Sequence, residues 1–233
     1  MKSLAMSLLG RFFVLCYKIR YGKNLSFVNH GIAIFHLYIN GSALFYLKKG
    51  KISKSTFHII GKNNSFIFDD HVTVRNCRFI VKGDNCIVDL RGCSLFDSRF
   101  ELLDSETRIE INKDTIMTTN RIVVAGGKNQ LHIGKGCLFA ENAEVWTSDT
   151  HSLLDMNTNK RINPDKPVYI GDRLWLGNRA LILKGVNIGN DTIVAAGSIV
   201  TKDIPNNTLV AGIPAVAIKT CVNWNETRIE EIL

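Results

Sequence analysis

The sequence predicts an all-β fold in which the chain winds into a parallel β-solenoid. Between Val168 and Asp203 an aliphatic residue recurs at every sixth position, with small or polar residues between: Ile170, Leu176, Ile182, Ile188, Val194 and Val200. An α-helix repeats about every 3.6 residues and a half-buried strand every two, so neither produces this spacing. A coil with three flat faces does, because six residues form one face and about eighteen complete a turn.

In such a coil each aliphatic side chain points inward and stacks on its equivalent one turn away, roughly 4.8 Å along the axis. The same spacing continues upstream at Ile133, Phe139 and Val145, and its next position falls on His151. Over residues 24–130 the spacing is looser, but short runs rich in Val, Ile and Phe alternate with Gly, Asn and Asp corners. We expect this region to form irregular coils of the same solenoid.

The first 23 residues predict a helix. The stretch from Leu4 to Tyr17 is apolar, but Arg11 interrupts it, no signal-peptidase site follows, and it is too short to span a membrane. Basic residues come next, at Lys18, Arg20 and Lys23. Two interpretations stay open: a helix that packs on the solenoid or a neighbouring subunit, and an interfacial helix that rests on an anionic inner leaflet.

Two further segments leave the repeat. Residues 152–167 are polar, contain Pro164 and Pro167 and lack periodicity, which predicts a loop that protrudes from the solenoid. Long loops on rigid scaffolds often carry binding and catalytic residues. The charged tail, residues 220–233, is expected to end the chain with a short helix.

Composition narrows the function classes. The chain has 233 residues, 45% of them hydrophobic, which suits one domain with small appendages. Its net charge of +8 favours anionic partners, but no RNP-like, zinc-finger or helix-turn-helix pattern supports nucleic acid as one of them. The six cysteines lack CxxC spacing, so we expect reduced thiols and a cytoplasmic location, with peripheral contact at the inner membrane as an extension of it.

His151 is the principal catalytic candidate. It lies where a regular coil meets the 152–167 loop, and an ordinary histidine pKa of about 6.5 suits a general base near neutral pH. The alternative is a surface histidine at a corner.

Four segments carry a family resemblance: SDTH at 148–151, IGDRLWLGNRALILKGVNIGN at 170–190, VAAGSIVTKDIP at 194–205 and AGIPAVAIK at 211–219. They resemble the left-handed β-helix acyltransferases of the hexapeptide-repeat superfamily, above all the sugar and polysaccharide O-acetyltransferases. The resemblance implies a left-handed coil, an acetyltransferase core over residues 131–219 and an acceptor region over 24–130. It also implies a homotrimer with its active site between adjacent subunits, which the 152–167 loop would reach.

The resemblance implies residue roles as well. His151 matches the general base that deprotonates an acceptor hydroxyl as it attacks the thioester of acetyl-CoA, and Trp175 matches the tryptophan lining the acceptor and cofactor cleft. Lys202 and Lys219 are expected to meet the phosphates of the cofactor. The positions matching the coenzyme A groove are Gly177, Asn178, Ala196, Gly197, Ser198, Thr201 and Lys202.

Two aspartates near His151 have two interpretations each. Asp149 either orients His151 or caps the turn, and Asp155 either solvates the loop or contacts substrate. Asn120 is a candidate contact for the acceptor sugar. We expect no metal, because a metal-dependent relative of the γ-carbonic anhydrase kind needs three converging histidines, and only His132 and His151 stand about one coil apart.

The expected function is acetyl-CoA-dependent O-acetylation of a sugar in a bacterial-type surface polysaccharide. Capsule and lipopolysaccharide both fit, and the positive charge suits acidic polymers such as polysialic acid. The alternative is N-acetylation of a nucleotide-linked amino sugar, which would use the same base and cofactor groove. A non-catalytic scaffold would be expected to lose the base or the tryptophan, and this sequence keeps both.

Overall fold

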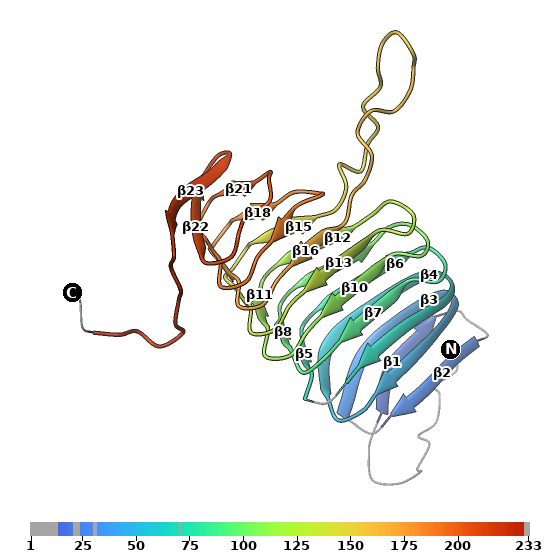
Figure 1. The fold of residues 1–233 in the computed structure, drawn as a ribbon. Coiled ribbons are helices and arrows are strands. Elements are labelled where there is room, and N and C mark those ends of the chain that lie inside the picture. Colours follow the sequence, from blue (N-terminus) through green and yellow to red (C-terminus); the bar gives the residue numbers. More distant parts are fainter. Residues whose placement is uncertain (1–13, 21–23, 30–31, 70, 231–233) are drawn as a thin grey trace.

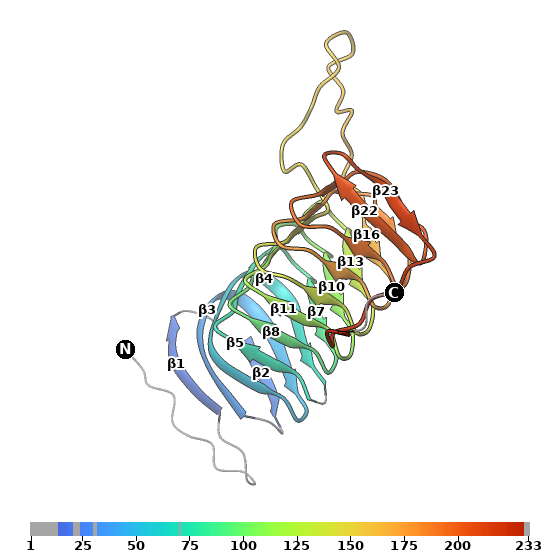
Figure 2. The same ribbon diagram turned by 90° about the vertical axis from the view of Figure 1, so that its left-hand side faces the viewer.

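The computed structural model describes residues 14–20, 24–29, 32–69 and 71–230, and shows one elongated parallel β-solenoid (Figures 1 and 2). The strands of the regular part stack in three columns, one for each face of the coil. The first face contains β7 (Ile87–Leu90), β10 (Arg108–Ile111), β13 (Gln130–Ile133), β16 (Val168–Ile170) and β19 (Asn187–Ile188).

The other two columns are built in the same way. The second face contains β5 (Thr73–Arg75), β8 (Ser94–Phe96), β11 (Ile116–Thr118), β14 (Leu138–Phe139), β17 (Trp175–Leu176), β20 (Ile193–Val194) and β22 (Thr208–Gly212). The third face contains β6 (Arg78–Lys82), β9 (Arg99–Leu102), β12 (Arg121–Val124), β15 (Glu144–Trp146), β18 (Leu181–Ile182) and β21 (Ile199–Val200).

Both ends of the solenoid depart from this pattern. At the N-terminal end the long strand β4 (Lys51–Phe68) runs around all three faces and pairs with β5, β6 and β7. It stacks on β3 (Ile32–Leu47), which in turn pairs with β1 (Val14–Arg20) and β2 (Asn24–Asn29). At the C-terminal end β22 pairs antiparallel with the last strand, β23 (Ala215–Thr220).

The six-residue repeat is confirmed by the burial of its members. Ile170, Leu176, Ile182, Ile188, Val194 and Val200 are all at most 4% exposed. In this part Leu181 pairs with Ile199, so one coil takes 18 residues. Upstream, Arg99 pairs with Arg121 and a coil takes 22 residues, which explains why the strict spacing fades there.

Larger side chains fill the wider upstream coils. The inward position of the third face runs Phe57, Phe79, Phe100, Ile122 and Val145 along the axis, each fully buried. The ring of Phe57 stacks on that of Phe79 at 4.7 Å, and Phe79 stacks on Phe100 at 4.9 Å. The core therefore changes from aromatic to aliphatic as the coils shorten.

Corners are made by residues in the left-handed backbone region. At the corner between the third and first faces the same position is taken by Asn63, Asn85, Glu106, Lys128 and Thr150, with φ between 56° and 64°. The amides of Asn85, Glu106 and Lys128 each donate to the backbone carbonyl of the residue that precedes the equivalent corner residue one coil earlier, as Glu106 does to Asp84. This column ends at Thr150, the residue before His151.

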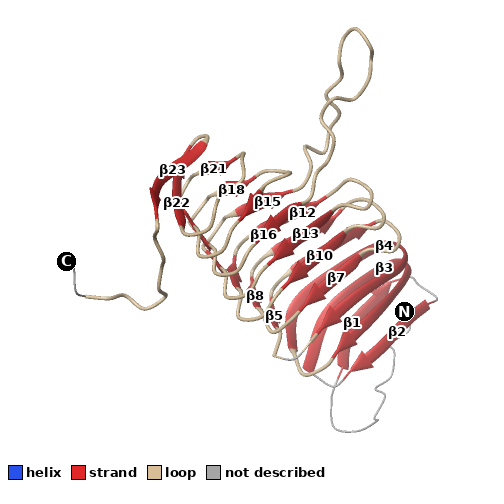
Figure 3. Cartoon of the chain, in the orientation of Figure 1, coloured by secondary structure: helices blue, strands red, loops and turns tan. Residues whose placement is uncertain are grey.

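The predicted helices are the part of the fold that needs correction. Figure 3 shows strands and loops but no helix in the described residues. Val14–Arg20 lies within the expected helix over 1–23 but forms β1, because its backbone groups form hydrogen bonds with the parallel strand β3. Residues 1–13 and 21–23 lie outside the described residues. Likewise no helix follows β23 as far as residue 230, and Trp224 anchors that tail to a corner of the solenoid instead. No described helix is available to cross a membrane.

Candidate active site

His151 stands at the foot of a long hairpin that projects from the solenoid between β15 and β16 (Figure 1). The residue before it, Thr150, holds the last left-handed corner position at φ 59°, and its amide donates to the hydroxyl of Ser148 at 2.8 Å. The His151 side chain is exposed, and its imidazole makes no hydrogen bond within the described part of the chain. The imidazole is thus held at a rigid corner with both ring nitrogens open to a substrate.

Asp149 belongs to a polar network beneath His151. Its carboxylate accepts hydrogen bonds from the Nζ of Lys184 and, at 2.7 Å, from the Nδ2 of Asn163. The hydrogen bond from Lys184 lowers the pKa of Asp149 below the ordinary aspartate value. Asn163 also donates to the backbone carbonyl of His151 at 2.9 Å. Asp149 is therefore connected to His151 through Asn163 and the backbone.

The projecting loop has its own internal structure. Leu154 and Arg161 form an antiparallel bridge, and at the tip one oxygen of Asp155 accepts hydrogen bonds from Asn157 and from the amide and hydroxyl of Thr158. These bonds lower the pKa of Asp155, the backbone amide of Thr158 most. Asp155 thus stabilises the turn at the tip. Apolar side chains are displayed along the hairpin, Met156 at 99% exposure and Leu153, Leu154 and Ile162 at about half.

Trp175 lies on the second face, 41% exposed, between Leu138 and Ile193 in the strand ladder. Its ring centroid is 6.1 Å from that of Trp224, a residue of the C-terminal tail. Trp224 is in turn fixed by a 2.6 Å hydrogen bond from its Nε1 to the carbonyl of Arg173. Sequence reasoning missed this second tryptophan, since only the fold brings residue 224 next to residue 175.

A surface cleft of about 620 Å³ opens beside the corner between the second and third faces. Gly197 borders it, with φ 71° and no atom within 4 Å of where a Cβ would stand. Ala196 is exposed next to it, and the carbonyl of Asn178 accepts a 2.8 Å hydrogen bond from the Gly197 amide. The remaining lining residues, which sequence reasoning did not identify, are Asn142, Glu144, Trp146, Arg179, Ala180, Leu181 and Ile199.

Two residues of the predicted groove serve the fold. A Cβ on Gly177 would lie 2.5 Å from the backbone nitrogen of Ala196, so close stacking of the coils requires glycine there. Ser198 is 1% exposed, and its hydroxyl accepts a 3.1 Å hydrogen bond from the Gly212 amide. Of the cationic candidates, Lys202 follows β21 at the corner reached by Lys184 one coil earlier, and Lys219 is exposed on β23; Thr201 is exposed beside Lys202.

Asn120 also has a structural role. Its side chain is 2% exposed, and its Nδ2 donates to the carbonyls of Ala140 and Ala143 in the next coil. Its own amide donates to the hydroxyl of Ser98 in the preceding coil. We therefore leave Asn120 out of the acceptor site.

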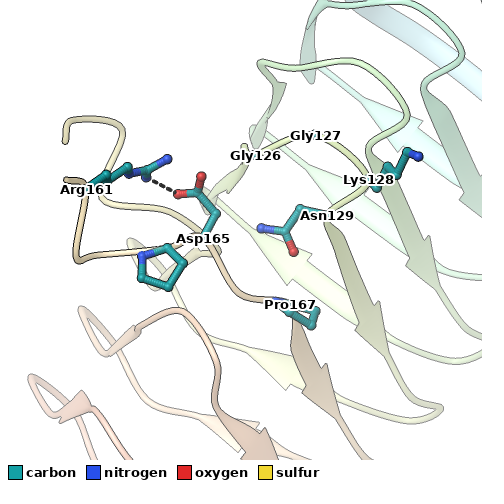
Figure 4. Close-up of a pocket in the computed structure, with 8 residues that line it drawn as sticks. Gly126, Gly127, Lys128, Asn129, Arg161, Asp165 and Pro167 are labelled. Carbon is teal, nitrogen blue, oxygen red and sulfur yellow. Dashed lines mark hydrogen bonds and ion pairs between the residues drawn. The ribbon is translucent and has the colours of Figure 1, made fainter.

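A smaller hollow of about 380 Å³ lies where the returning arm of the loop meets the Gly126–Asn129 corner (Figure 4). Arg161 lines it and forms a 2.9 Å ion pair with Asp165. Lys128 lines the opposite side and is 77% exposed. No group of three potential metal ligands occurs within the described ranges.

Within one chain the predicted site residues fall on separate edges of the solenoid. His151 and its loop leave from the corner between the third and first faces. The cleft at Gly197 borders the corner between the second and third faces, and Trp175 lies on the second face. His151 and the cleft at Gly197 therefore do not share an edge of the solenoid within one chain.

These features match a known class of protein. Residues 167–202 match the family model described as the hexapeptide repeat of succinyl-transferase. The chain is 30% identical to the solved structure of the polySia-specific acetyltransferase NeuO, with a TM-score of 0.71 and 85% of each chain covered. The chain belongs to the hexapeptide-repeat acyltransferase superfamily.

Further comparisons point to one group of these enzymes. The solved polysialic acid O-acetyltransferase OatWY is 25% identical, with a TM-score of 0.74, over 91% of this chain and 95% of that one. A polysialic acid O-acetyltransferase of Neisseria meningitidis is 31% identical over 131 residues. Those residues are 54% of this chain and 59% of the relative, so the chain spans less than two thirds of that relative's length.

Proposed function

We propose that the protein is an acetyl-CoA-dependent O-acetyltransferase that acts on a sugar hydroxyl of a bacterial capsular polysaccharide. The observation that carries the proposal is the exposed, unbonded imidazole of His151 at a rigid corner, in a fold shared along most of its length with polysialic acid O-acetyltransferases. An unbonded ring nitrogen can accept a proton as soon as a hydroxyl reaches it.

The proposed reaction transfers the acetyl group directly from acetyl-CoA to the sugar hydroxyl. The imidazole of His151 takes the proton of the acceptor hydroxyl while the hydroxyl oxygen attacks the thioester carbonyl of acetyl-CoA. The carbon–sulfur bond then breaks, the acetyl group stays on the sugar as an ester, and the imidazolium returns its proton to the departing sulfur. Free coenzyme A and the O-acetylated glycan leave the site.

The donor fits the cleft beside Gly197. The small residue Gly197 borders it with the exposed Ala196 next to it, and Arg179 supplies a positive charge for a phosphate. Trp146 supplies an apolar wall, with the guanidinium of Arg121 stacked 4.6 Å over its ring. Lys202 lies at the corner that carries His151 and Lys219 is exposed on β23, so neither lines this cleft within one chain.

An acidic polymer suits the acceptor side. The net charge of +8 attracts an anionic glycan, and Lys128 and Arg161 flank the hollow beside the loop. Such a polymer is assembled at the inner face of the membrane, so we propose a cytoplasmic location with peripheral contact there. Release of free thiol from acetyl-CoA on addition of polysialic acid or another acidic capsular polymer tests the proposal. Thiol release with nucleotide-linked amino sugars alone would overturn it.

The donor cleft yields a direct prediction. Gly197→Leu should weaken acetyl-CoA binding at least about tenfold, equivalent to roughly 1.4 kcal/mol, because the new side chain would occupy open cleft space. Gly136→Leu is the matched control: it has a similar φ of 62° and room for a Cβ, but lies at another corner. Calorimetric titration with acetyl-CoA measures both, and equal affinities in the two variants would place the donor elsewhere.

The separation of His151 from the cleft predicts a site shared between copies, which we propose to be subunits of a homotrimer. His151→Ala lacks the base and Gly197→Leu binds the donor weakly, so at an acetyl-CoA concentration below the wild-type KM each alone should retain at most about a tenth of wild-type activity. When the two variants are co-assembled from equal amounts, about one interface in four pairs an intact His151 with an intact cleft. About a quarter of wild-type activity should therefore return. A mixture that stays as inactive as its components would show that each chain works alone.

A further inference from the structure

The side chain of Asn163 ties together the two arms of the loop next to His151. Its Nδ2 donates to the carboxylate of Asp149 at 2.7 Å and to the carbonyl of His151 at 2.9 Å. Its Oδ1 accepts from the amide of Leu153 at 2.7 Å and from the Nε of Arg161 at 3.2 Å. One side-chain amide therefore fixes the first arm of the loop at Asp149 and Leu153, on both sides of His151.

Lys184 joins this network to the solenoid itself. It follows β18 in the next coil, and its side chain is only 18% exposed. Its ammonium group donates to the same oxygen of Asp149 that Asn163 contacts and, at 3.2 Å, to the backbone carbonyl of Asn163. Through Lys184, the backbone around His151 is anchored to the rigid coil as well as to the exposed hairpin.

We infer that Asn163 and Lys184 are positioning residues for His151, acting through its backbone and through Asp149. The inference rests on the proposed function of His151 as the base. It also assigns Asp149 a role other than direct contact with the imidazole, because its carboxylate accepts hydrogen bonds from Lys184 and Asn163.

The anchor affects the distance between the imidazole and the proton that it removes. A base works only within hydrogen-bond distance of the proton that it removes, and a misplacement of about 1 Å can cost on the order of 100-fold in rate. The imidazole itself has no hydrogen bond among the described residues that would fix it. The backbone anchor therefore fixes the point from which the imidazole reaches an acceptor hydroxyl.

The kinetic test compares Asn163→Ala and Lys184→Met with controls in the same loop, Asn157→Ala and Lys160→Met, whose side chains are exposed. We expect kcat to fall roughly 10- to 100-fold in the first pair, with KM for acetyl-CoA within about twofold of wild type. Lys184→Arg, which keeps the charge, should retain at least about a third of the activity. Wild-type kcat in Asn163→Ala, or a joint collapse of kcat, acetyl-CoA affinity and thermal midpoint, would overturn the inference.

Hydrogen exchange tests the anchor without the reaction. The Leu153 amide loses its acceptor in Asn163→Ala, and its exchange should accelerate at least about tenfold, while Asn157→Ala should leave it unchanged. Unchanged exchange in Asn163→Ala would overturn the anchor and leave the proposed function intact. If wild type releases no thiol with any acceptor, the proposed function fails, and with it the assignment of these residues to catalysis.

Discussion

Replacing His151 with alanine is expected to lower kcat by about 10²- to 10⁴-fold, the range that a positioned general base contributes. The affinity for acetyl-CoA should stay within about twofold of wild type, because the base acts in the transition state and not in ground-state binding of the donor. His151 is not among the residues that line the cleft proposed for the donor, so the substitution removes no part of its wall. Steady-state thiol release and calorimetric titration together measure both quantities.

His36→Ala provides the control for this experiment. His36 is also exposed, but lies on β3 near the N-terminal end of the solenoid, several coils from the loop. Its replacement should leave kcat unchanged. If His151→Ala retained more than about a tenth of wild-type kcat, the general base would have to be another group.

Phe57→Ala is expected to destabilise the fold by about 3–5 kcal/mol, the usual cost of removing a buried phenylalanine. Its ring is fully buried, stacks on Phe79 at 4.7 Å and meets the edges of Phe45 and Phe66 at 5.2 and 5.3 Å. The substitution would leave a cavity that neighbouring coils cannot close, because both are held in register by strand pairing. Chemical denaturation of the two proteins measures the difference in unfolding free energy.

Phe96→Ala separates this effect from the loss of any aromatic ring. Phe96 is only half-buried on the outside of the second face, with Arg75 4.9 Å over its ring. Its removal should cost at most about 1 kcal/mol. Similar costs for the two phenylalanines would mean that the aromatic stack is not the main support of the wide coils.

The regular half of the fold could be predicted because it is periodic. Each inward residue from Ile170 to Val200 occupies the same position within its face, so a step of six residues leads to the next face and a step of 18 stacks a residue on its equivalent, as Ile170 on Ile188. The loop was predictable for the opposite reason, since periodicity stops at His151 and resumes at Val168. Where coils lengthen to 22 residues, the spacing carries less information and only the type of structure could be anticipated.

The ends of the chain show what a local pattern leaves out. Val14–Arg20 was predicted to be helical because a short apolar run has no periodicity that separates helix from strand. This segment forms a strand because it pairs with residues 33–38 of β3, which a local pattern does not show. The anchoring of Trp224 on Arg173 bridges 51 residues and has no local signal at all.

The same limit applies to the candidate site. Motif resemblance proposed His151 and the Ala196–Gly197 corner as site residues, because the chemistry assigned to them depends on residue type. It did not identify Asn163 or Lys184, which contact Asp149 across 14 and 35 residues of sequence. Nor did it separate Gly177 and Ser198, which the stacking of coils requires, from neighbours that border open space.

The most direct measurement is the chemical fate of a labelled acetyl group. The full-length protein would be incubated with acetyl-CoA carrying ¹³C in its carbonyl and with de-N-acetylated as well as intact polysialic acid, and the polymer examined by NMR. We predict an ester carbonyl on a sugar hydroxyl of the intact polymer, removed by mild base and absent with His151→Ala. Label found only as a base-stable amide on free amino groups would contradict O-acetylation and identify an N-acetyltransferase.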